Sequence, residues 1–237
     1  MHPSRSSRIR TMPALEDLYG VFRDGVHAGW MLADLVRAVA EPGAVVIALA
    51  PQGRAVGAAM AAALHLPLDL ATAGTIAVPW SDELWLGAVA FDGTLYLDPA
   101  RLLDATLTRA ELEAAIESGL RDAADGEERY RDGRPLPSLN GRPAILVDDG
   151  LSPTCVIRVV MSALENAGAS RVVLALPTGK QHEVKRLAER AFRTYCANLH
   201  HDFGAQLARA YQDVDRSTGP AIRPAPGQPM SLSPDKP

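Results

Sequence analysis

Short apolar runs alternate with amphipathic segments along most of the chain. The runs have the length and composition of strands buried on both faces, at residues 44–50, 68–71, 144–147 and 171–176, with a fifth candidate at 195–199. Helical spacing or composition predicts helices between them, at residues 26–40, 54–64, 182–192 and from the loop after the third run to Ala167. This alternation predicts an α/β fold, a mostly parallel sheet with helices on both faces.

The middle of the chain follows a different pattern. Residues 83–90 and 94–98 flank Asp92-Gly93, a turn signal typical of a β-hairpin. Thr108 and Glu111 have the spacing of a capping box, which opens a long helix. The apolar residues of that helix form one narrow stripe, so most of it should face water: Leu112, Ile116 and Leu120. We therefore expect a small hairpin or hood element beside the main sheet.

Both ends of the chain differ from the body. Residues 1–12 are polar and basic, and we expect a mobile tail there. Residues 217–237 hold six prolines and little that could pack, which predicts a disordered or extended tail. A proline-rich ligand for a partner domain is the alternative for this tail. The sequence thus predicts one domain over residues 13–216.

Composition and charge exclude several classes of protein. With 47% hydrophobic residues among 237, the chain can build a buried core and is not wholly disordered. A formal net charge of -4 argues against a nucleic-acid binder. Only two cysteines, Cys155 and Cys196, exclude a disulfide-rich scaffold, and no apolar run approaches the roughly 20 residues of a membrane helix. We expect a cytoplasmic protein that binds neither nucleic acid nor membrane; a homo-oligomer remains compatible with the sequence.

The segment after the third buried strand carries the strongest chemical signal. Asp148 and Asp149 stand together at the strand end, which is electrostatically costly unless a sugar diol, Mg²⁺ or an arginine lies against them. The short loop that follows enters a helix N-terminus, which suits a phosphate. The two features together describe a site for a phosphorylated ribose. The alternative is that both acids cap or solvate a turn, with Ser152 or Thr154 as a plain N-cap.

This arrangement of apolar strand, Asp-Asp-Gly, small-residue loop and helix resembles the 5-phosphoribosyl-1-pyrophosphate (PRPP) motif of type I phosphoribosyltransferases. Further stretches resemble one bacterial and archaeal subgroup of that family, in the same order along the chain: residues 22–36, 45–70, 83–98, 141–150 and 210–215.

The resemblance implies Mg²⁺-dependent exchange of the pyrophosphate of PRPP for a nitrogenous base. It makes Asp148 and Asp149 the catalytic acids, which would hold the ribose hydroxyls directly or through Mg²⁺. The 5'-phosphate would be wrapped by Gly150, Leu151, Ser152, Pro153, Thr154, Cys155 and Val156. The pyrophosphate would be held by the backbone of Pro51, Gln52, Gly53 and Arg54.

The chain departs from the family pattern in three places. The usual Thr-Gly-x-Thr of the phosphate loop is replaced by residues 153–156, where Pro153 removes an N–H donor and Val156 a hydroxyl. An Arg-Lys pair, whose cations the resemblance expects to meet the pyrophosphate charge, is replaced by Ala-Thr-Ala at residues 71–73. Arg54 stands where the subgroup commonly has glycine, and it either supplies one positive charge or is a solvated residue at the helix start. These changes predict a reduced or altered activity. A non-catalytic PRPP- or nucleotide-binding regulatory module and a scaffold without ligand are the alternatives.

Three other candidates carry weaker signals. Lys180 follows a strand end and either faces a ligand cleft or is a surface residue. Cys155 is interpreted as a small buried residue rather than a nucleophile. The His200-His201-Asp202 run lacks a third ligand at the expected spacing, which argues against a zinc site.

Overall fold

The computed structural model describes residues 9–132, 134, 136 and 138–213. In this part of the chain, six strands form one parallel sheet in the order β1–β9–β8–β7–β2–β3. Their bounds are Ile9–Thr11 for β1, Val45–Leu49 for β2, Leu68–Ala71 for β3, Pro143–Val147 for β7, Arg171–Lys180 for β8 and Arg193–His200 for β9. The predicted α/β class is confirmed.

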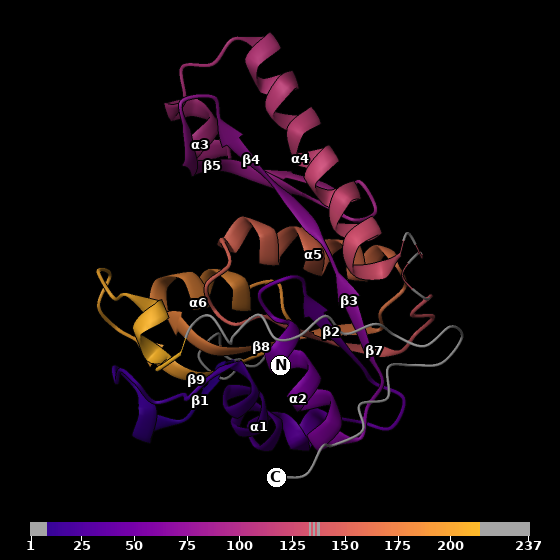
Figure 1. Cartoon of the computed structure of the whole chain (residues 1–237), viewed down its shortest axis with the longest axis vertical. Coiled ribbons are helices and arrows are strands. Elements are labelled where there is room, and N and C mark those ends of the chain that lie inside the picture. The colour runs from indigo at the N-terminus through magenta and orange to yellow at the C-terminus, as the bar shows by residue number, and fades with distance from the viewer. Residues whose placement is uncertain (1–8, 133, 135, 137, 214–237) are drawn as a thin grey trace, which may run out of the picture.

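Helices cover both faces of this sheet (Figure 1). Helices α1 (Gly25–Val36) and α2 (Arg54–Leu64) pack on one face, and α5 (Thr154–Asn166) and α6 (Gln181–Ala188) pack on the other. The carboxyl ends of β2 and β7 lie next to each other because the two strands pair in parallel. No helix among the described residues combines the length and apolar composition that crossing a membrane requires.

A smaller antiparallel unit, here called the hood, follows β3 in the chain. Its sheet contains β4 (Ala73–Val78), β5 (Ser81–Ala90) and β6 (Leu95–Leu97), followed by α3 (Pro99–Asp104) and α4 (Arg109–Arg131). The predicted capping box opens α4, with the Thr108 side chain accepting from the Glu111 amide and the Glu111 carboxylate accepting from the Thr108 amide. Figure 1 shows the hood projecting from the face of the main sheet that carries α5.

A polar cluster fastens the hood helix to the edge strand β3. The buried Arg131 side chain forms an ion pair with Asp69, and its Nε lies 3.1 Å from Glu127 Oε2. Thr72, the single residue between β3 and β4, donates its hydroxyl to Glu127 Oε1 at 2.6 Å. Burial raises the pKa of Glu127. A β-carbon at Gly126 would lie 3.0 Å from Thr72 Cβ, so helix and strand approach closely here.

The structure corrects several predicted boundaries. Ile9–Thr11 fall in the predicted mobile tail 1–12, yet they form β1, because the edge of β9 offers their main chain a hydrogen-bonding partner. Strand β8 does not end at residue 176 but continues to Lys180. Strand β4 was not predicted, since alternating small residues give little hydrophobic contrast. The proline-rich tail 217–237 lies outside the described residues, so its disorder stays a prediction.

Candidate functional site

Asp148 and Asp149 follow β7 and are almost fully buried, with 0% and 1% of their surface exposed. Their carboxylates bind the loop that comes after them. Asp148 Oδ2 accepts from the Gly150 amide at 2.9 Å, and Asp148 Oδ1 accepts from the Ser152 hydroxyl at 2.7 Å. Asp149 Oδ1 accepts from the Leu151 amide at 2.9 Å. The two acids therefore cap the turn, as the alternative interpretation of the sequence had it, but its N-cap was wrong, because Pro153 and not Ser152 or Thr154 occupies that position.

Gly150 lets the chain make this turn. Its φ is +87°, in the region that favours glycine. A β-carbon there would clash with the carbonyl oxygen of Thr178 on β8 and would lie 2.9 Å from Thr178 Cγ2. The turn is therefore packed directly against the neighbouring strand, which fixes where the following helix begins.

The buried acids carry unfavourable charge. Burial raises the pKa of both carboxyls, and the charge of Asp148 raises the pKa of Asp149 further. No arginine or lysine forms an ion pair with either acid in the described part of the chain, and the Tyr211 hydroxyl donates only to the Asp149 carbonyl oxygen, at 2.6 Å. A cation or a proton would therefore be favoured here.

The loop leads into a cavity of about 800 Å³. Its walls come from α5, α6, the hood and the segment around residues 205–208. Six of the seven predicted phosphate-loop residues line it: Gly150, Leu151, Ser152, Pro153, Thr154 and Cys155. Val156 is the exception, since it is 7% exposed, packs in the core under α5 and donates its amide to Pro153. The missing hydroxyl at residue 156 therefore removes nothing from the cavity wall.

The start of α5 supplies donors to this cavity. Pro153 is the N-cap and has no side chain that could bond the helix end. The amides of Thr154 and Cys155 donate to no protein oxygen among the described residues, because the first amides of a helix have no acceptor within it. An anionic ligand in the cavity could accept from them.

The predicted pyrophosphate loop lies beside the acids but does not line the cavity. A β-carbon at Gly53 would lie 2.6 Å from the Val147 carbonyl oxygen and 2.9 Å from Asp148 Cα, so only glycine lets the two loops touch. Pro51 follows a cis peptide bond and is partly exposed, and Gln52 is exposed. Arg54 is buried with its guanidinium 5.4 Å from the Tyr130 ring centroid, and burial lowers its pKa.

Residues 71–73, which stand where the subgroup has an Arg-Lys pair, have a structural role in this chain. Thr72 is 2% exposed and belongs to the polar cluster that holds α4, so a long cation there would have to displace that contact. The structure thus explains why residues 71–73 are small: they form the passage between main sheet and hood.

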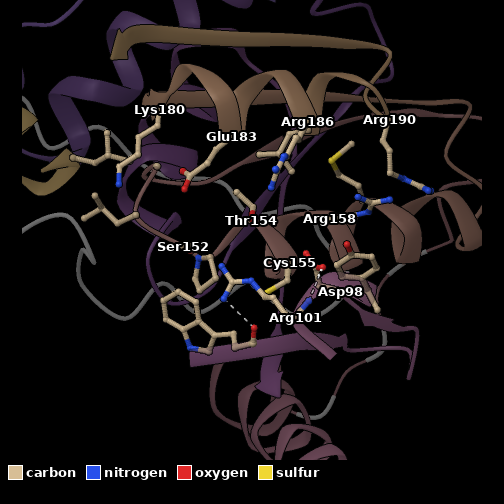
Figure 2. A pocket seen from close by; sticks show the side chains of 18 of the residues that line it. Asp98, Arg101, Ser152, Thr154, Cys155, Arg158, Lys180, Glu183, Arg186 and Arg190 are labelled. Carbon is tan, nitrogen blue, oxygen red and sulfur yellow. Dashed lines mark hydrogen bonds between the residues drawn. The ribbon is translucent and has the colours of Figure 1, made fainter. Parts of the chain in front are cut away.

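The cavity also contains basic residues that sequence reasoning did not place. Figure 2 shows Glu183 and Arg186 on α6, Arg190 just after that helix ends, Arg158 on α5, and Asp98 with Arg101 on the hood side. Lys180 lines the cavity too, as one of its two interpretations had it. The helical spacing of Thr154 and Arg158 on α5 was a usable signal, because residues four apart share a face.

The structure places Cys155 on the cavity wall, partly exposed, and not buried as interpreted from the sequence. Burial raises the pKa of the Cys155 thiol to about 11, so it is not a thiolate at neutral pH. No group of three or more His, Cys, Asp or Glu side chains is arranged for a metal ion among the described residues.

Known proteins resemble this chain in sequence and in fold. No protein-family model matches it. Two proteins of Mycobacterium tuberculosis, from strains H37Rv and CDC 1551 / Oshkosh, are named putative phosphoribosyl transferase, and each is 31% identical over 176 residues. The match covers 74% of this chain but 40% of each relative. The crystal structure of TT1426 from Thermus thermophilus superposes with a TM-score of 0.66 at 32% identity, covering 81% of this chain and 90% of that one.

Proposed function

Because the chain belongs to the same family as TT1426 and the mycobacterial putative phosphoribosyl transferases, we propose that it binds PRPP and exchanges the pyrophosphate for a nitrogenous base. One observation carries this proposal. After the turn Asp148–Gly150, the loop and the N-terminus of α5 lie at one end of a cavity that is lined by several cations. The amides of Thr154 and Cys155 there have no acceptor among the described residues.

The residues divide into two roles. The amides of Thr154 and Cys155 and the Thr154 hydroxyl are placed to hold the 5'-phosphate, with Lys180 nearby on the cavity wall. Asp148 has both carboxylate oxygens engaged with its own loop, so we assign it the positioning of that loop. Asp149 has one oxygen bonded to Leu151. It is 1% exposed and, like Asp148, does not line the cavity, so we assign it to the ribose side of a ligand that would have to reach it behind the loop.

The acids also fit a Mg²⁺ ion in donor chemistry. Mg²⁺ prefers carboxylate oxygens and usually takes one or two of them together with phosphate oxygens and water. Asp149 would hold the ion, and Asp148 would steady its loop. Bound there, Mg²⁺ would neutralise the charge that burial penalises in this pair and would stabilise the leaving pyrophosphate.

In the proposed exchange, the bond from the ribose anomeric carbon to pyrophosphate oxygen breaks and a bond to the base nitrogen forms. The base nitrogen releases its proton to solvent, and pyrophosphate leaves with the electron pair of the broken bond. The chain contributes by orienting the 5'-phosphate at the start of α5.

A non-catalytic PRPP- or nucleotide-binding module is the second candidate. The observation that favours it is the place of Arg54, which is buried beside Tyr130 rather than turned toward the cavity, and of Thr72, which holds α4. The cations expected to meet the pyrophosphate are therefore engaged elsewhere or replaced.

Thermal unfolding with Mg²⁺ and PRPP tests binding, and pyrophosphate release with a panel of bases tests turnover. Saturation to about 100 times Kd should stabilise the fold by about 2.7 kcal/mol, or roughly 5–10 °C in Tm. Asp149→Asn should remove most of this shift, whereas the matched control Asp104→Asn, exposed on the hood, should keep it. Binding with turnover supports the transferase, binding without turnover supports the regulatory module, and no shift at millimolar PRPP refutes the transferase and a PRPP-binding module.

A further inference from the structure

The cavity is positively charged in a negatively charged protein. Five basic side chains line it, against three acidic ones: Arg101, Arg158, Lys180, Arg186 and Arg190, against Asp98, Glu183 and Glu189. The whole chain has a formal charge of -4. Such local enrichment concentrates anions in the cavity.

Several of these cations have no acidic partner among the residues that the structure describes. Arg190 lies 3.1 Å from Glu165, and Asp98 uses its carboxylate to cap α3. By contrast, Arg158, Arg186 and Lys180 form no ion pair with any described residue. The arginines at the α5–α6 end of the cavity therefore have their charge available for a ligand.

Arg158 is held ready for such a ligand. It is partly buried, and its guanidinium carbon lies 4.5 Å from the ring centroid of Tyr96 on the hood. Stacking on an aromatic ring fixes the guanidinium plane and leaves its N–H edge free for two parallel hydrogen bonds to a carboxylate. Arg186 extends into the same cavity from α6, which packs beside α5 (Figure 2).

The spacing between Thr154 and Arg158 fits a single ligand whose phosphate lies at Thr154 and whose second anionic group lies at Arg158. Arg158 follows Thr154 by one turn on the same face of α5, a rise of about 6 Å along the helix. A ribose that has its 5'-phosphate at Thr154 carries its anomeric substituent about this far away. Tyr96, Trp85 and Met161 also line the cavity, which favours a planar ring between the two walls.

We propose that the acceptor of this protein is a planar nitrogen heterocycle that carries a carboxylate, bound by Arg158 and Arg186. This inference rests on the proposed function, because it assumes a ribose phosphate at the loop. It excludes neutral bases as the preferred acceptors.

Two pairs of probes isolate the carboxylate: orotate with uracil, and nicotinate with nicotinamide. We would titrate each by calorimetry in the presence of Mg²⁺ and ribose 5-phosphate, which cannot react. In at least one pair, the acid should bind at least tenfold more tightly than its neutral partner. Arg158→Gln and Arg186→Gln should each reduce this preference at least fivefold. Arg121→Gln, a matched change on the exposed face of α4, should leave it unchanged.

Two further measurements separate the outcomes. Arg158→Lys keeps the charge and should retain more of the preference than Arg158→Gln. Arg186 is exposed, so its variant reports on the site even if Arg158→Gln does not fold. If ribose 5-phosphate binds but no acid is preferred, or if the preference survives both glutamine variants, this inference is wrong and the proposed function stands. If ribose 5-phosphate itself does not bind, the proposed function fails as well.

Discussion

Replacing Gly150 with alanine should destabilise the protein far more than the same change at Gly43. Both glycines have a similar backbone, with φ of +87° and +89°. They differ in what an added β-carbon meets. At Gly150 it would clash with the Thr178 carbonyl and lie 2.9 Å from Thr178 Cγ2, whereas at Gly43 nothing lies within 4 Å. The pair therefore separates the cost of the conformation from the cost of the contact.

The magnitudes follow from these two costs. Alanine in the left-handed region costs about 1–2 kcal/mol, which the lower entropy of the unfolded chain partly offsets, so Gly43→Ala should cost about 1 kcal/mol. Overpacking against a buried strand adds about 1–3 kcal/mol. Gly150→Ala should therefore cost about 2–4 kcal/mol in total.

Urea unfolding, followed by circular dichroism and by tryptophan fluorescence, measures this difference. In a domain of this size each kcal/mol shifts Tm by about 2–4 °C, so thermal unfolding should separate the variants by several degrees. Equal destabilisation of the two variants would show that β8 can move away from the turn, and that the loop after β7 is not fixed by Thr178. In that case the start of α5 would lose its main positional restraint.

Two further predictions concern the hood and the cavity. Arg131→Met should destabilise the protein by about 3–5 kcal/mol, because it leaves Asp69 and Glu127 without their cation. Arg121→Met removes an exposed ion pair of 3.9 Å and should change the free energy of unfolding by less than about 1 kcal/mol. Similar losses for both variants in urea unfolding would refute the role of the cluster. At pH 8, Cys155 with a pKa of about 11 should react with iodoacetamide about 100-fold more slowly than a thiol of pKa 9. The rate should rise about tenfold per pH unit up to about pH 11, and bound PRPP should lower it. Mass spectrometry measures the alkylation, and a fast reaction at pH 8 or a rate that PRPP does not change would contradict this prediction.

The parallel sheet was predictable because its signals are local. Each buried strand is an apolar run bounded by turns, and the limits predicted for α2 and β3 agree with those in the structure. The β8 extension was not predictable in this way, because Thr178, Gly179 and Lys180 do not continue the apolar run. They become strand only because β9 pairs with them.

The candidate site was predictable only where one segment builds it. The Asp148–Cys155 segment forms its turn and one end of the cavity through its own residues. The opposing wall comes from the hood and α6, and no local pattern shows that Tyr96 and Arg158 meet. Arg54 illustrates the same limit, since its burial against Tyr130 depends on where α4 packs.

On its N-terminal side, the hood joins the main sheet through a junction of one residue, Thr72. Strand β3 leads into β4 with no loop between them, and the ion pairs of Arg131 with Asp69 and Glu127 hold this junction. The hood also carries Trp85, Tyr96 and Arg101, which line the cavity together with residues of α5 and α6. A substitution at Thr72 that displaced α4 or β4 would therefore shift the hood residues that line the cavity, although Thr72 itself does not line it.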